Sequence, residues 1–169
     1  ATIQSGMTQA EDNSRQEMTG HVIIAGFGLP GRAVATILQE RGERFCVIEL
    51  NPATVERCHA AGLQIIAGDV ADPDALRRAG ITTARLFVVA VPNETVAIEA
   101  TRLARELNPH VRIITRCHYT SAGMSAIRSG AEAVVVSEQV VAEELRSLIW
   151  ERLEPLDSPP PHTSNTGAP

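Results

Sequence analysis

Six short apolar runs alternate along the chain with stretches that have helical character. The runs cover residues 21–26, 45–50, 63–68, 85–91, 111–116 and 133–136. Their hydrophobicity is continuous rather than alternating, which is typical of strands that are covered on both faces. Strands that alternate with helices form βαβ units, and such units build parallel sheets. The pattern therefore predicts a doubly wound α/β fold around one six-stranded parallel sheet.

The stretches between the runs carry signals for the starts and ends of helices. Asn51–Pro52 and Asp72–Pro73 each place a capping side chain before a proline that suits the first helical turn. We expect a helix after each pair. Helical patterns also cover residues 30–41, 93–107, 121–128 and 137–153, the last beginning at Ser137 as a capping residue.

The length of 169 residues is enough for one domain of ordinary size. We expect the folded domain to span residues 20–156. Residues 1–19 are polar and lack periodicity, which predicts a flexible N-terminal segment. Residues 157–169 contain four prolines and no aliphatic side chain larger than alanine, which predicts a disordered tail.

Composition argues against several functional classes. A net charge of −5 and a pI near 5.5 disfavour a nucleic-acid surface. No apolar run approaches the ~20 residues of a membrane-spanning helix. All 15 basic residues are arginines, so a phosphate-binding lysine and a Schiff-base lysine are both absent. The three cysteines lack the spacing of a disulfide framework or a metal site, and they suit a reducing compartment.

The first apolar run leads directly into the sequence Gly26-Phe27-Gly28-Leu29-Pro30-Gly31, a GxGxxG pattern between a predicted strand and a predicted helix. In a Rossmann-like fold the first glycine allows the tight turn, the second lets a pyrophosphate approach the backbone, and the third lets the helix pack on the strand. The helix N-terminus attracts phosphate. Arg32, just beyond, either contacts phosphate or is a solvated surface residue.

Acidic residues end the second and third predicted strands. Glu49 lies 18 residues after Gly31, where a carboxylate accepts hydrogen bonds from both ribose hydroxyls. It also repels a 2′-phosphate, which disfavours NADP. Asp69 either accepts a hydrogen bond from an adenine amino group or caps a turn. The neighbours expected in the same site are Leu50, Asn51, Gly68 and Val70.

The ends of the fourth and fifth predicted strands complete the expected site. Ligands of doubly wound sheets bind at the point where the strand order reverses. Asn93 either contacts the ligand or caps the next helix. Arg116 either faces phosphate across the crevice or pairs with an acid such as Asp69 or Glu94. The other residues of the fourth-strand loop are Ala90, Val91 and Pro92.

From His21 to about Leu153 the chain resembles the RCK N-terminal domain, also called the KTN or TrkA-N-like domain, of potassium channels, Trk-type uptake systems and Kef-type antiporters. The segments that carry the resemblance are HVIIAGFGLPGR, VIELNPATVER, LQIIAGDVADPDALRRAGI, AVPNETVAIEATRLARELNP and VRIITRCHY. The resemblance implies a cytoplasmic regulatory module at the inner face of the membrane. Such a module binds NAD(H), AMP, ADP or ATP and modulates a membrane-embedded cation channel or transporter.

The resemblance also implies a homodimer or a larger ring. In the last predicted helix Val141, Leu145 and Leu148 fall on one face, which we expect to cover the sheet. Trp150 falls on the opposite side of that helix. Because tryptophan is enriched at protein interfaces, we expect Trp150 to contact a partner subunit.

Two other functions stay open at this point. A fragment of an NAD-dependent oxidoreductase needs an acid or base near the nicotinamide, and Cys117-His118-Tyr119 is the candidate cluster. A structural assembly module with a vestigial pocket is the second alternative, because Leu29 replaces the basic residue that many relatives carry after the second glycine. We predict a non-enzymatic switch without catalytic residues, in which the nucleotide shifts a conformational equilibrium.

Overall fold

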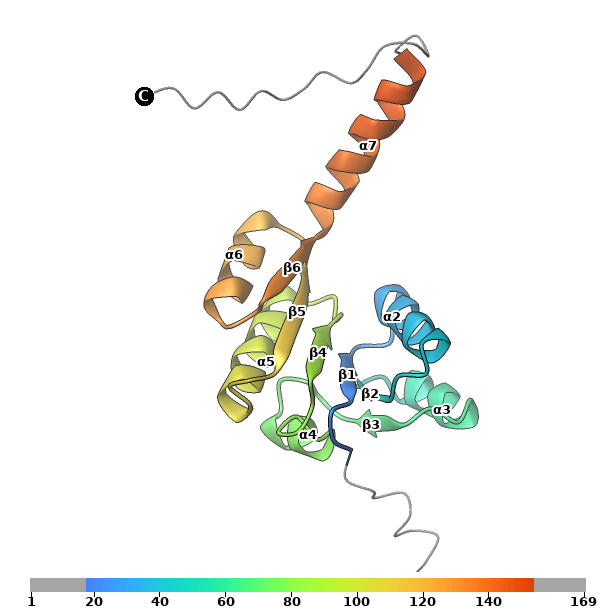
Figure 1. The fold of residues 1–169 in the computed structure, drawn as a ribbon, viewed down its shortest axis with the longest axis vertical. Coiled ribbons are helices and arrows are strands. Elements are labelled where there is room, and N and C mark those ends of the chain that lie inside the picture. Colours follow the sequence, from blue (N-terminus) through green and yellow to red (C-terminus); the bar gives the residue numbers. More distant parts are fainter. Residues whose placement is uncertain (1–17, 154–169) are drawn as a thin grey trace, which may run out of the picture.

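The computed structural model describes residues 18–153 (Figure 1). The flexible segment predicted for residues 1–19 and the tail predicted for residues 157–169 lie outside the described residues, apart from residues 18 and 19. The strands are β1 (Val22–Ala25), β2 (Phe45–Glu49), β3 (Ile65–Ala67), β4 (Leu86–Val89), β5 (Arg112–Cys117) and β6 (Ala133–Val136). The helices are α2 (Leu29–Glu40), α3 (Pro52–Ala60), α4 (Pro73–Arg78), α5 (Glu94–Leu107), α6 (Thr120–Arg128) and α7 (Ser137–Leu153).

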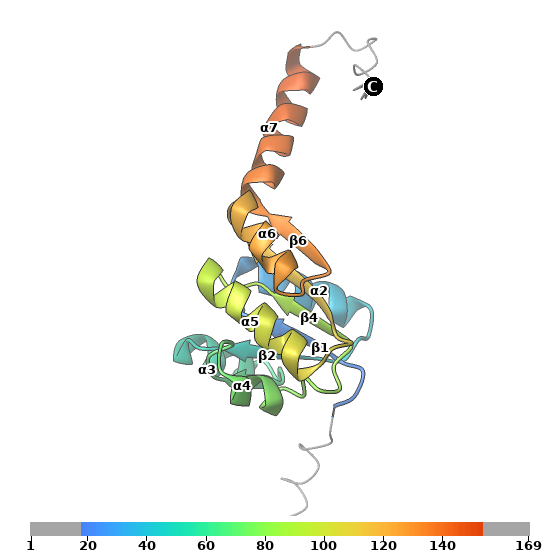
Figure 2. The same ribbon diagram turned by 90° about the vertical axis from the view of Figure 1, so that its left-hand side faces the viewer.

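Within this part of the chain, the six strands form one parallel sheet in the order β3-β2-β1-β4-β5-β6. The predicted doubly wound, Rossmann-like fold is thus confirmed. Helices α2 and α3 cover one face of the sheet, and α4, α5 and α6 cover the other (Figures 1 and 2). The strand order reverses between β1 and β4, which places a crevice at the carboxyl ends of these strands.

Two apolar cores flank the sheet and explain its continuous hydrophobicity. Successive side chains of a strand point to opposite faces. In β1, Ile23 therefore packs in the core beneath α4, α5 and α6, whereas Ile24 packs in the core beneath α2 and α3. Phe87 and Val47 are fully buried partners in the two cores. Both faces of the central strands are buried. An alternation of polar and apolar residues would therefore bury polar side chains, which explains why the strands are continuously apolar.

The predicted helix starts are confirmed at α3 and α4. The Asn51 Oδ1 atom accepts hydrogen bonds from the backbone N–H groups of Ala53 (3.0 Å) and Thr54 (3.4 Å). The Asp72 Oδ1 atom accepts one from the N–H of Asp74 (2.9 Å). In both helices a proline follows the cap, where its missing N–H costs no intrahelical hydrogen bond.

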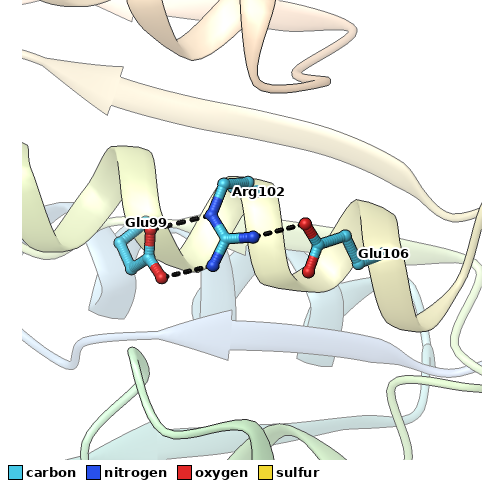
Figure 3. A network of polar contacts seen from close by, with 3 residues as sticks. All are labelled: Glu99, Arg102 and Glu106. Atoms are coloured by element: carbon cyan, nitrogen blue, oxygen red, sulfur yellow. Dashed lines mark hydrogen bonds and ion pairs between the residues drawn. The ribbon is translucent and has the colours of Figure 1, made fainter.

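Helix α5 combines a buried face of small side chains with a charged outer face. On the outer face Arg102 donates hydrogen bonds to Glu99 (Nε, 2.9 Å; Nη2, 2.6 Å) and to Glu106 (Figure 3). Such exposed pairs stabilise a helix only weakly. Burial of the other face therefore holds α5 on the sheet. Its buried residues are Ala97, Ala100, Thr101, Leu103 and Ala104.

The prediction that α7 covers the sheet is wrong. None of its residues is buried, and Val141, Leu145 and Leu148 expose 57%, 58% and 38% of their surface. Both views show α7 extending away from the sheet (Figures 1 and 2). The physical reason is the absence of a connecting loop: β6 ends at Val136 and α7 begins at Ser137. A helix that starts directly after the last strand residue has no turn with which to reverse onto the sheet.

Candidate functional site

A cavity of about 500 Å³ lies at the carboxyl ends of strands β1 to β5. This volume is in the range of small-molecule sites. All of the site residues expected from the sequence line this cavity except Gly31, Arg32 and Asn51. Ile48 and Val96, which were not expected from the sequence, also line it. Ile48 directly precedes Glu49 and Val96 lies three residues after Asn93, but nothing in their sequence context distinguishes them from core residues.

The three glycines of the GxGxxG sequence have different structural roles. Gly26 has a positive φ of 88°, and a Cβ atom there would lie 3.0 Å from the side chain of Val91. At Gly31 a Cβ atom would lie 2.0 Å from the Gly26 carbonyl oxygen, so only glycine allows α2 to pack this close to β1. Gly28 has open space instead, with Pro30 at 4.0 Å as its nearest neighbour. The packing of the protein alone thus requires Gly26 and Gly31 but not Gly28.

The N-terminus of α2 faces the same cavity. The first N–H groups of a helix have no intrahelical partners. Gly28, the residue before α2, has no side chain that could cap them. Pro30 contributes no N–H, so the donors of the first turn come from Leu29 and Gly31. These donors and the positive end of the helix dipole suit an anionic ligand.

Glu49 connects the glycine loop to the end of β2. Its Oε2 atom accepts a hydrogen bond from the Phe27 N–H (2.8 Å), and its Oε1 atom accepts one from the Asn51 N–H (2.9 Å). The expected site residue Asn51 therefore holds this carboxylate from outside the cavity. Each carboxylate oxygen can accept a further hydrogen bond, so acceptors remain for ribose hydroxyls. The contact with Phe27 joins residues 22 positions apart, and the sequence offers no signal for it.

Asp69 and Asn93 both have the local structural role that the sequence left open. The Asp69 Oδ1 atom accepts a hydrogen bond from the Ala71 N–H (2.9 Å) within a turn. The Asn93 Oδ1 atom accepts one from the Val96 N–H (3.1 Å) and so caps α5. Both residues also line the cavity. A second polar atom of each side chain, Oδ2 or Nδ2, is left for a ligand.

Arg116 is half-buried at the end of β5 and lines the cavity. The alternative pairing with Asp69 or Glu94 is wrong, because Arg116 forms no ion pair within residues 18–153. Glu94 instead accepts hydrogen bonds from the backbone N–H groups of His118 and Tyr119, in the loop after β5. Among the described cavity-lining residues, Arg116 is the one basic side chain, and it shares the cavity with the carboxylates of Glu49 and Asp69.

Arg32 does not line the main cavity. It lies beside a smaller cavity of about 190 Å³ between α2 and α3, together with Thr54 and Arg57. The reason is helical geometry: Arg32 follows Gly31 by about 100° around α2, on the side that faces α3. A contact between Arg32 and phosphate therefore stays a prediction, and Arg32 is exposed as the alternative of a solvated surface residue expects.

Cys117, His118 and Tyr119 do not converge on the cavity. Cys117 is buried in the core beneath α4, α5 and α6, and burial together with Glu94 raises the pKa of its thiol, against a weaker opposing effect of Arg116. The His118 Nε2 atom lies 3.1 Å from the Pro92 carbonyl oxygen. Tyr119 exposes 60% of its surface. None of these three residues lines the cavity.

Across residues 18–153, no three histidine, cysteine or acidic side chains gather closely enough to hold a metal ion. In the same range no helix has both the length and the apolar character needed to cross a membrane.

Comparison with known sequences identifies related proteins. The TrkA-N domain family matches residues 22–137. The putative K(+) efflux antiporter KefB of Alkalimonas amylolytica is 31% identical over 125 residues, which are 74% of this chain and 19% of that protein. The putative cation/proton antiporter YbaL of Escherichia coli (strain K12) is 26% identical over 151 residues, which are 89% of this chain and 26% of that protein. The chain thus spans a fifth to a quarter of these relatives.

Comparison with solved structures gives the same group of proteins. The TrkA-N domain of the Escherichia coli inner membrane protein ybaL superposes with a TM-score of 0.76 at 26% identity, covering 79% of this chain and 98% of that chain. GsuK bound to ADP gives 0.69 at 26% identity, with 82% and 36% covered. The Shewanella denitrificans Kef CTD in AMP-bound form gives 0.65 at 25% identity, with 78% and 80% covered.

Proposed function

The chain belongs to the TrkA-N domain family, and on this premise we propose that it is a regulatory domain that binds NAD(H) or an adenine nucleotide and thereby modulates a cation channel, transporter or antiporter. The observation that carries the proposal is the cavity at the strand-order reversal, which gathers the glycine loop, Glu49, Asp69 and Arg116. Related proteins of known structure were solved with ADP and with AMP.

Each part of the cavity suits one part of such a ligand. The phosphates lie against the glycine loop and the N-terminus of α2, where Arg116 adds a charge-assisted contact. The ribose hydroxyls donate to Glu49, whose negative charge also disfavours the 2′-phosphate of NADP. The adenine amino group donates to Asp69. Ile48 and Val96 supply apolar contact for the adenosine.

The domain acts by binding rather than by catalysis, in our proposal. KefB and YbaL are described as antiporters, and each is about four to five times longer than the matched segment. We place the domain on the cytoplasmic side of such a membrane protein, either as part of its chain or as a bound subunit. A nucleotide shifts the state of the transporter only by its difference in affinity between the two states.

Calorimetric titration with NADH, NAD⁺, ATP, ADP and AMP tests the nucleotide proposal. We expect one of these ligands to bind, and Arg116→Ala to weaken that binding by about tenfold or more, because a hydrogen bond to a charged group contributes about 1.5–3 kcal/mol. Arg112→Ala is the matched control: Arg112 lies on the same strand but is exposed and paired with Glu132 (2.7 Å). Absence of binding by all five ligands favours the assembly module with a vestigial pocket.

The role of Glu49 is best tested by changing the ligand. Glu49→Ala removes the ribose acceptor and also two hydrogen bonds that hold the glycine loop and Asn51. Loss of binding in this variant therefore has two explanations. Comparison of ADP with 2′-deoxy-ADP on the unchanged chain removes one ribose hydroxyl and leaves the protein intact. We expect the deoxynucleotide to bind about tenfold more weakly, since a carboxylate acceptor is left unpaired.

We also propose that α7 forms a homodimer contact, within a dimer or a larger ring. Its exposed apolar side chains include Val141, Leu145 and Leu148. Exposed apolar surface of this extent is typical of interaction sites. Trp150 is only partly exposed on the same helix. Because Trp150 lies on the opposite side of α7 from Val141, a second copy of the chain must pack around the helix to cover all of these residues. The dissociation constant of the dimer measures this contact.

A further inference from the structure

A series of hydrogen bonds leads from the edge of the cavity into the loop after β5. Pro92 lines the cavity, and its carbonyl oxygen lies 3.1 Å from the Nε2 atom of His118. His118 follows Arg116 by two residues along the same chain segment. The loop after β4 and the loop after β5 therefore meet directly beside the residues that line the cavity.

Glu94 holds the same two loops together from the other side. It is the first residue of α5 and follows the cap residue Asn93, which lines the cavity. Its Oε1 atom accepts hydrogen bonds from the N–H groups of His118 (2.6 Å) and Tyr119 (3.0 Å). One carboxylate thus ties the start of α5 to the backbone just beyond Arg116. A displacement of the loop after β4 should therefore also displace the loop after β5, and the reverse.

The loop after β5 and Thr120, the first residue of α6, also hold the first turn of α7. The Glu138 N–H donates to the His118 carbonyl oxygen (3.1 Å). The Glu138 Oε1 atom accepts from the N–H (2.8 Å) and the hydroxyl (2.7 Å) of Thr120, and the Gln139 side-chain amide donates to that hydroxyl (3.1 Å). Because α7 buries none of its side chains, these contacts and its continuity with β6 determine its direction.

We propose that the contact between Thr120 and Glu138 transmits nucleotide binding from the cavity to α7. The inference rests on the proposed nucleotide function. A phosphate that binds Arg116 fixes the end of β5, the adjoining loop follows, and Glu138 carries the change into the helix. Trp150 lies about 20 Å along α7 from Ser137, so a rotation of about 10° at the first turn displaces it by about 3 Å.

The chemistry of the contact supports this role. Thr120, through its hydroxyl and its backbone N–H, holds the pKa of the Glu138 carboxyl below its usual value. Glu138 is therefore ionised at neutral pH, and both hydrogen bonds from Thr120 are charge-assisted. Glu138 and Thr120 are positioning residues, since neither lines the cavity. Their removal should change the response of α7 and leave the nucleotide contacts in place.

Hydrogen–deuterium exchange of the full chain with and without ADP, with AMP and NAD⁺ in parallel, tests the inference. We expect the bound nucleotide to slow exchange in residues 26–31, 118–122 and 137–145, the last by about threefold or more. Glu138→Ala should retain protection of the first two segments and lose that of 137–145. Calorimetry should show that the nucleotide affinity of Glu138→Ala differs from that of the unchanged chain by no more than about threefold. Linkage requires this, because the coupling that the variant loses is of that size.

Two further variants separate coupling from a general effect on the helix. Glu138→Gln retains an acceptor oxygen for Thr120 and should restore part of the protection in 137–145. Glu143→Ala removes a glutamate of the same helix that pairs with Arg146 (2.5 Å) and makes no contact with the loop. In Glu143→Ala the nucleotide should protect residues 137–145 as it does in the unchanged chain.

Two results overturn the inference while the proposed function stands. In the first, the nucleotide still protects residues 137–145 in Glu138→Ala. In the second, the nucleotide protects residues 26–31 of the unchanged chain but not residues 137–145. A different result, in which no nucleotide binds the unchanged chain and residues 26–31 stay unprotected, overturns the proposed function, and the inference fails with it.

Discussion

Helices α5 and α7 have 14 and 17 residues, and both carry glutamate–arginine pairs on their surface. Helix α5 nevertheless buries a full face on the sheet, whereas α7 buries no residue. Residues 90–93 separate β4 from α5 and let the chain reverse direction, but no residue separates β6 from α7. Apolar residues of a helix therefore reach the sheet only when the preceding loop lets the helix return to it.

The two helices also differ in the spacing of their apolar residues. In α5 the buried residues recur every three or four positions, as a single face requires. In α7 the apolar side chains are spread more widely around the helix, and all are at least partly exposed. The expectation that Val141, Leu145 and Leu148 form a sheet-facing side relied on three positions of a helix whose other apolar residues include Val140 and Trp150, which lie on other sides.

The largest expected effect comes from a charge placed on each helix. Ala100→Glu puts a carboxylate into a fully buried position and should lower the free energy of unfolding by about 3–5 kcal/mol. Leu145→Glu changes an exposed position of α7 and should alter the stability of the monomer by less than about 0.5 kcal/mol. Urea denaturation at low protein concentration measures both. A similar loss in the two variants would show that α7 packs on its own domain in solution.

A second prediction concerns the partner proposed for α7. Leu145→Glu and Trp150→Ala should each raise the dimer dissociation constant by about thirtyfold, because loss of an interface anchor costs about 2 kcal/mol. Glu144→Gln serves as control on the same helix and should leave it unchanged. Analytical ultracentrifugation gives the constants. Unchanged dimerisation in Trp150→Ala would refute a contact through that side chain.

A smaller effect is expected at the first turn of α5. Asn93→Ala removes the acceptor for the Val96 N–H and should lower the free energy of unfolding by about 1 kcal/mol. Glu138→Ala, at the corresponding turn of α7, should change the stability of the domain less, since α7 contributes no buried surface. Thermal denaturation followed by circular dichroism compares the two. A larger loss in Glu138→Ala would mean that the first turn of α7 supports the core.

The smallest expected effect is a lowered glutamate pKa, and it should be similar in both helices. Arg102 lowers the pKa of Glu99, and Arg146 lowers the pKa of Glu143. A lowered pKa in the folded state means that each pair stabilises fully above the unfolded value near 4.5 and loses this contribution as the pH falls through the folded pKa. Carboxyl carbon NMR titration should place both values below 4.5. A value at or above 4.5 for Glu143 alone would show that α7 is frayed at this point.

Much of the candidate site could be predicted because its residues follow strands directly. In a parallel sheet all carboxyl ends lie at one edge, so residues after β1 to β5 meet there whatever their separation in sequence. The exceptions have geometric causes. Arg32 follows the site residue Gly31 but points toward α3. Ile48 and Val96 line the cavity through side chains that are otherwise indistinguishable from core residues.

The sequence by itself determined the alternation of strands and helices, the helix starts at Asn51 and Asp72, and the glycine loop, because each depends on periodicity or on neighbouring residues. Only the tertiary structure decided that Glu49 accepts a hydrogen bond from Phe27, that Arg116 makes no ion pair in the described part of the chain, and that α7 leaves the sheet. These features depend on distances between remote residues and on the direction in which a strand ends, and neither is encoded in a local pattern.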